Sequence, residues 1–100
     1  MSKVINITDK FSTEQASIQI GKKVYPVDNS VEAVLRFEEL AQDASAKSLL
    51  FAIEGALGNK AYEEIGVAKM SVANLKVLMT ALLAAMQELS YEEADARFRQ

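Results

Sequence analysis

The sequence contains no cysteine, no histidine and no tryptophan among its 100 residues, and it has a single proline. Without cysteine, the chain can form no disulfide, no thiolate metal site and no cysteine nucleophile. Without histidine, it lacks the commonest general base and the commonest metal ligand of proteins. A composition free of cysteine suits the reducing cytoplasm. These absences argue against most metal-dependent and nucleophilic chemistry.

The chain also lacks a long apolar run and a concentration of positive charge. Its longest apolar block, VLMTALLAAM, has about half of the 18 or more residues that a membrane span needs. The opening stretch, MSKVINITDK, contains no apolar core of a secretory signal. The formal net charge is −3, whereas nucleic-acid surfaces require clustered lysine and arginine. The sequence therefore predicts one soluble, cytoplasmic domain over residues 1–100 that binds neither nucleic acid nor a membrane.

Residues 16–27 have the pattern of a β-hairpin. Apolar and polar residues alternate in IQI, which is the period of a half-buried strand. The turn falls either on Gly21-Lys22 or on Lys22-Lys23, and glycine tolerates the positive φ that such turns require. In either register, one face of the hairpin carries Ile18, Ile20, Tyr25 and Val27.

The residues on either side of this hairpin core are less regular. Pro26 cannot donate a hydrogen bond to a ladder, so the second strand is expected at a sheet edge. Residues 1–15 are expected either to be flexible or to form a short strand at Val4, Ile5 and Ile7.

Residues 30–98 have helical periodicity, so the fold class is α+β, predominantly α-helical, with about four to five helices after the hairpin. The helices are expected over about 30–42, 46–57, 60–65, 71–89 and 90–98. Serine, asparagine and glycine mark their ends. The expected signals are an Asn29–Glu32 capping box with Ser30 as the alternative cap, a stop at Gly58-Asn59, a cap at Ser71, and a Ser90–Glu93 capping box.

The longest helix is unusually apolar. Its stripe is spaced 3, 4, 3, 4, 3 and consists of Val72, Leu75, Met79, Leu82, Met86 and Leu89. Between Val72 and Gln87 the only charged residue is Lys76. Such a helix lies either at the centre of its own domain or partly under another chain.

Four apolar residues are candidates for an interface with a partner or with a second copy. Phe51 and Val77 each lie about 160° from the centre of their helix's apolar stripe, counted at 100° per residue. Tyr91 and Phe98 share one face of the last helix, which is too short to persist alone in water. The alternative is that all four contact neighbouring helices, or are the scattered apolar surface residues that every protein has.

No constellation of catalytic groups is evident. The adjacent carboxylates Glu38-Glu39, Glu63-Glu64 and Glu92-Glu93 point about 100° apart on a helix and do not converge. The glycines form neither a dinucleotide fingerprint nor a phosphate-binding loop. The sequence therefore predicts no catalytic residue, no cofactor and no metal site, and a protein that is not an enzyme.

The stretch IQIGKKVYPVDNSVEAVLRFEEL, a hairpin joined directly to a capped helix, resembles the start of a known family. These are the small tail assembly chaperones of long-tailed (siphovirus-type) phages and prophages of Gram-positive bacteria. In that family an extended I-x-I-G…Y-P-V-D run leads into a helix with an acidic end, and more helices follow. The resemblance in layout runs from Ile18 to Phe98. No invariant family motif identifies a binding site in this sequence.

The resemblance implies a non-catalytic function in phage tail assembly. Such chaperones bind the tape measure protein in the cytoplasm of the bacterial host and keep it soluble while tail tube subunits polymerise around it. They self-associate and are absent from the mature virion. Many are also made as a longer, frameshifted product, whose extension would reach the tail tube protein. Met79 and Met86 would suit an adaptable binding surface of this kind.

A rival interpretation from another class remains open. The chain could be a small regulatory or inhibitory helical protein that binds a host protein.

Overall fold

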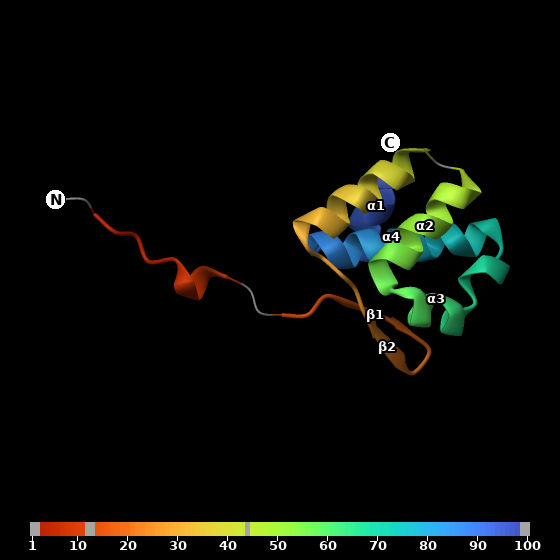
Figure 1. The fold of residues 1–100 in the computed structure, drawn as a ribbon, viewed down its shortest axis with the longest axis horizontal. Helices are drawn as coiled ribbons and strands as arrows, with labels where there is room; N and C mark the ends of the chain where they lie inside the picture. The colour runs from red at the N-terminus through yellow and green to blue at the C-terminus, as the bar shows by residue number, and fades with distance from the viewer. Residues whose placement is uncertain (1–2, 12–13, 44, 99–100) are drawn as a thin grey trace.

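A computed structural model describes residues 3–11, 14–43 and 45–98, except for the side chain of Phe98. Its architecture is a two-stranded antiparallel hairpin followed by five α-helices, a predominantly helical α+β fold as predicted (Figure 1). The elements in chain order are η1 (Thr8–Lys10), β1 (Ser17–Ile20), β2 (Lys23–Pro26), α1 (Val31–Asp43), α2 (Ala46–Leu57), α3 (Asn59–Ile65), η2 (Val67–Lys69), α4 (Val72–Gln87) and α5 (Tyr91–Phe98).

The hairpin adopts the first of the two registers considered. Ile20 pairs with Lys23, so Gly21 and Lys22 form the turn. Gly21 has a φ of 62°, in the left-handed region that glycine adopts without a steric penalty. The predicted apolar face is confirmed, with one qualification. Ile18, Tyr25 and Val27 are buried, whereas Ile20, next to the turn, is 40% exposed.

Helix α4 lies in the middle of the helical body (Figure 1). Leu82 on α4 and Ile53 on α2 are completely buried, and Phe37 on α1 is 2% exposed, so three helices contribute to one core. Of the two positions considered for this helix, the structure has the central one for most of the stripe. Val72 is the exception, at 61% exposed, because it is the first residue of α4 and the helix enters the core only from Leu75 onward.

Four serines, Ser30, Ser45, Ser71 and Ser90, cap helices, and the structure decides between the two caps considered for α1. The amide of Ala33 donates to Ser30 Oγ at 3.2 Å, so the alternative cap begins α1 in place of the Asn29–Glu32 box. The Ser90–Glu93 box is confirmed, with reciprocal bonds of 3.0 and 3.1 Å. Ser71 accepts from the amide of Asn74 at 3.1 Å and begins α4 as predicted.

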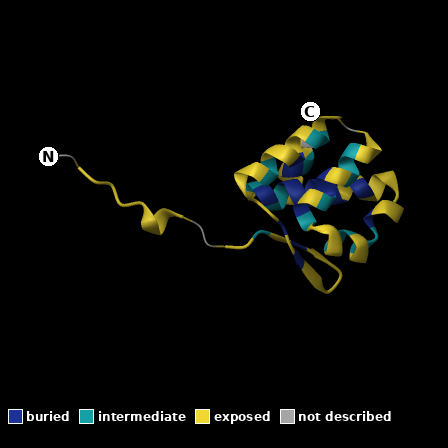
Figure 2. Ribbon diagram, viewed as in Figure 1, coloured by how far each residue is buried: buried dark blue, intermediate teal, exposed yellow. Residues whose placement is uncertain are grey.

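Residues 3–11, called the arm below, contain no strand. The short strand considered at Val4, Ile5 and Ile7 is absent, and a single turn of 3-10 helix, η1, follows Ile7. Every residue of the arm is exposed, including Val4 at 88% (Figure 2). The arm runs away from the helical body (Figure 1), and the longest dimension of the molecule is 60 Å against 31 and 23 Å for the others.

Within the described part of the chain, no single helix combines the length and the apolar character needed to cross a membrane. α4 and α5 together would reach that length, but they meet at an angle of 110°.

Candidate interaction surface

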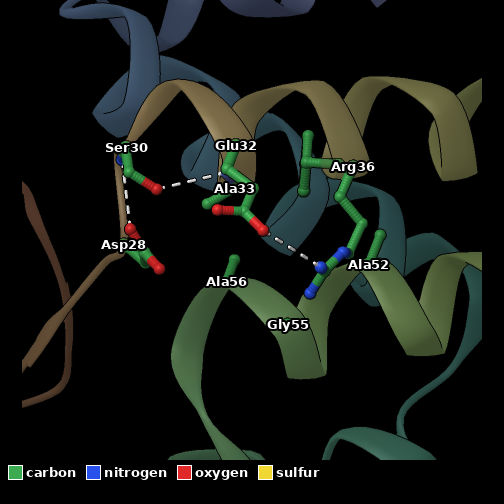
Figure 3. A pocket seen from close by; sticks show the side chains of 9 residues that line it. Asp28, Ser30, Glu32, Ala33, Arg36, Ala52, Gly55 and Ala56 are labelled. Atoms are coloured by element: carbon green, nitrogen blue, oxygen red, sulfur yellow. Dashed lines mark hydrogen bonds and ion pairs between the residues drawn. The ribbon is translucent and has the colours of Figure 1, made fainter.

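A polar hollow of about 190 Å³ lies where the hairpin joins α1 (Figure 3). Asp28, Ser30, Glu32 and Arg36 surround it, and Ala52, Gly55 and Ala56 of α2 form its opposite wall. The local sequence explains this arrangement. The amide of Asp28 donates to the carbonyl of Ala56 at 3.0 Å, which ties the start of α1 to the end of α2.

The charged groups of this hollow are engaged in local structure. Asp28 Oδ1 accepts from the amide of Ser30 at 3.1 Å, and this hydrogen bond holds the pKa of Asp28 below its usual value. Arg36 lies 3.8 Å from Glu32, four residues earlier on the same exposed helix face. The lowered pKa of Asp28 is the opposite of the raised pKa that a general acid at neutral pH requires. The hollow is thus a by-product of helix capping.

A second polar cluster fastens the hairpin to α3. Glu64 Oε1 accepts hydrogen bonds from Lys23 Nζ and, at 3.2 Å, from Tyr25 Oη. The contact with Lys23 lowers the pKa of Glu64, and the same contact raises the pKa of Lys23. Burial, followed by the bond to Glu64, raises the pKa of Tyr25. Each polar group satisfies another, so the cluster has a structural role in orienting the hairpin.

Across the described ranges, no three or more carboxylates are grouped so that they could hold a metal ion. Asp43 is an example of a carboxylate that is engaged in local hydrogen bonds instead. It accepts hydrogen bonds from the hydroxyls of Ser45 and Ser48, and the bond from Ser48 is the main reason that its pKa is lowered. Glu93 accepts from the amide of Ser90, which lowers its pKa as well. Both carboxylates stabilise the start of a helix.

An apolar hollow lies between the hairpin and α4. This β1–α4 groove has a volume of about 260 Å³. Its wall on the hairpin side consists of Ile18, Gln19 and Ile20, and its other wall consists of Met70, Asn74, Val77, Leu78 and Ala81. Val77 is 51% exposed and Ile20 is 40% exposed, so the groove presents branched apolar side chains to solvent.

The three predicted interface residues whose side chains the structure describes do not all line the same hollow. Val77 lines the β1–α4 groove, whereas Phe51 on α2 and Tyr91 on α5 do not. Phe51 is 52% exposed, with the ammonium group of Lys47 6.0 Å from its ring centre, and Tyr91 is 41% exposed. The side chain of Phe98 lies outside the described residues. Exposure of Phe51 and Val77 agrees with their predicted position opposite the apolar stripe.

The last helix packs on the body through Ala94, which lies on the same helix face as Tyr91. Ala94 is completely buried, and Arg97 Nη1 donates to Gln87 Oε1 at 2.6 Å. Met79 and Met86, considered for an adaptable binding surface, are 3% and 6% exposed and belong to the core. The stripe spacing that placed them on one face of α4 already favoured the core.

The sequence did not identify the residues that lie near Val77 in the groove. Ile20 and Met70 lie 57 and 7 residues from Val77 along the chain, and only the packing of the hairpin on α4 brings them together. The one sequence signal was the period-two pattern of the hairpin, which marks Ile20 as apolar but does not identify its neighbour.

Comparison of the chain with protein-family models, with characterised proteins and with solved structures found no match.

Proposed function

We propose that this chain is a tail assembly chaperone of the long-tailed phage type, which binds an apolar helical partner, the tape measure protein, without catalysis. The support is twofold. The hairpin-to-helix layout resembles that family, and the helical body exposes large apolar side chains while its polar groups are engaged in caps and in the Lys23–Glu64 contact. The protein would act in the cytoplasm of the bacterial host and would be absent from the mature virion.

The observation that carries the proposal is the exposure of apolar side chains on separate helices. Val31 and Leu35 on α1 are 76% and 60% exposed, and they lie one helical turn apart on the same face. Phe51 on α2 is 52% exposed. Branched and aromatic side chains that remain in water favour binding to another apolar surface. When one helix binds another protein through its apolar face, side chains at positions i and i+4 make the contact.

A tape measure protein presents long apolar helical faces until the tail tube covers them. A chaperone that holds it must bind many similar stretches, so shallow apolar contacts suit this role better than a deep polar pocket. The described pockets of the chain are open hollows. Contact with the tail tube protein would belong to a frameshift-extended form.

Co-expression tests the proposal. The chain is produced with the long helical protein encoded next to it, and the two are passed over a sizing column. Co-elution is expected, together with aggregation of the larger protein when it is made alone. A larger protein that stays soluble alone and elutes separately would contradict the chaperone function.

A variant pair locates the contact. Leu35→Asp should reduce co-elution because it places a charge in the exposed apolar pair of α1. Gln42→Asp adds the same charge at an exposed polar position of that helix and should leave co-elution unchanged. Co-elution that is unchanged in Leu35→Asp would show that this apolar pair of α1 does not bind the partner.

A further inference from the structure

We propose that the β1–α4 groove of one copy receives the arm of a second copy, which adds a strand to the free edge of β1. The chain carries two apolar surfaces that nothing in its described part covers. One is a hollow beside a strand edge, and the other is the arm, in which Val4, Ile5 and Ile7 are exposed. The inference does not depend on the identity of any other partner, because both surfaces belong to this chain.

The two edges of the hairpin differ in their capacity to pair with another strand. Ile20 and Lys23 flank a two-residue turn and form a hydrogen-bonded pair. From this pair onward, the opposed residues of the two strands alternate between non-hydrogen-bonded and hydrogen-bonded pairs. The bond of 2.9 Å from the amide of Val27 to the carbonyl of Ala16 fits this alternation. Ser17 and Pro26 therefore form a non-hydrogen-bonded pair, whose backbone groups face outward.

This geometry blocks one edge and leaves the other available. On the outer edge of β2, Pro26 presents no N–H where a third strand would need one. On the outer edge of β1, Ser17 and Gln19 direct both N–H and C=O away from β2. Gln19 lines the groove, so this open edge and the apolar hollow are adjacent. A strand that pairs with β1 would place its side chains against α4.

The arm matches the groove in character and in length. Val4, Ile5 and Ile7 are 88%, 75% and 52% exposed. In an extended chain, Ile5 and Ile7 point to the same side. Residues 4–7 extend over about 10 Å at 3.3 Å per residue. The groove wall from Asn74 to Ala81 covers about the same distance at 1.5 Å per residue of helix.

The way the arm leaves the hairpin favours a second copy over the same copy. Gln15 Nε2 donates to the carbonyls of Ala16 and Val27, at 3.0 and 3.1 Å. Together with the Val27–Ala16 bond, these contacts continue the line of β1 beyond its first residue. The arm thus runs away from the hairpin turn and from the helical body that contains α4 (Figure 1).

One arm covers less than the roughly 800 Å² per partner of a standard interface, so self-association should be weak and concentration-dependent. Two variants test the mechanism. Ile5→Asp disrupts the arm and keeps the groove, and Val77→Asp disrupts the groove and keeps the arm. Each should weaken self-association of the full chain about tenfold or more, measured by sedimentation across a dilution series. Both positions are exposed, so each monomer should keep its circular dichroism spectrum.

Matched controls isolate the contact. Asn6→Asp adds the same charge next to Ile5 but on the opposite side of an extended strand. Its side chain can still accept the bonds of 3.0 and 2.7 Å that Asn6 Oδ1 accepts from the amide and hydroxyl of Thr8. Val72→Asp adds a charge at a more exposed apolar residue of the same helix, outside the groove. Both controls should associate like the unmodified chain.

Mixing the two defective variants gives the decisive result. The Ile5→Asp chain offers an intact groove and the Val77→Asp chain offers an intact arm, so the mixture should form pairs that contain one of each. If the arm instead folds onto its own groove, mixing restores nothing, and Ile5→Asp lowers the melting temperature without changing the mass. An unmodified chain that stays monomeric at high concentration would also overturn the proposal.

Discussion

The arm and the helical body are built from the same kinds of apolar residues but expose them to opposite extents. Ile53 in α2 is completely buried, whereas Ile5 in the arm is 75% exposed. The core of the body is one cluster of side chains from the hairpin region, η2 and the helices α1, α2, α4 and α5, whereas every residue of the arm is exposed. The comparison teaches that apolar character predicts burial only where tertiary neighbours exist. It also means that identical substitutions should have unequal effects in the two regions.

The largest effect is expected in the body. Leu82→Ala removes a completely buried side chain from the centre of α4 and should lower the free energy of unfolding by about 2–5 kcal/mol. Ile5→Ala, in the arm, should change it by less than about 0.5 kcal/mol. Urea denaturation of both variants, at a concentration where the chain is monomeric, measures the contrast. Equal losses would show that the arm packs on the body.

A smaller effect is expected at a helix cap. Ser71→Ala removes the acceptor for the amide of Asn74 and should cost about 1 kcal/mol of unfolding free energy. Ser71→Asp keeps an acceptor at the same place and should cost much less. Urea denaturation again provides the measurement. If both variants lose the same amount, the cap does not stabilise α4.

A pH-dependent effect is expected where the hairpin meets α3. The bond from Lys23 lowers the pKa of Glu64 below its usual 4.5, so the contact is fully present above pH 4.5 and is lost as the pH falls through the lowered value. The pKa of Lys23 is raised above 10.5, so the contact is also lost as the pH rises through that raised value.

Glu64→Gln should therefore be less stable than the unmodified chain by a constant amount across neutral pH. This difference in stability between the two proteins should disappear in strong acid and in strong base. Thermal unfolding at a series of pH values measures it. Glu63→Gln leaves the Lys23 contact in place and serves as the control. A gap that stays constant into strong acid would show that Lys23 and Glu64 do not pair in solution.

The smallest effect on stability is expected from loss of the arm. Removal of residues 1–12 should shift the melting temperature of the monomer very little, because residues 3–11 bury nothing. Differential scanning calorimetry at low concentration measures the shift. A large drop would mean that Val4 to Ile7 form a strand of the sheet in solution.

Much of the fold could be read from local patterns. The stop at Gly58 and the cap at Ser71 depend on residues next to one another, and both were predicted. The turn at Gly21 and Lys22 was one of the two turns considered. The choice between Asn29 and Ser30 as the cap of α1 could not be made, since both residues fit the pattern. Exposure of Phe51 and Val77 also followed from periodicity, because a helix fixes the direction of each side chain.

The sequence by itself determined the fold class, the helix ends and the apolar faces, because each depends on residues within one or two turns of chain. Only the tertiary structure decided which of these surfaces meet. The contact of Lys23 with Glu64 spans 41 residues, and the groove joins Ile20 to Val77. No local pattern encodes such pairs, since they depend on how the hairpin docks on the helices. The same packing buried Met79 and Met86 in the core and left Val72 in solvent.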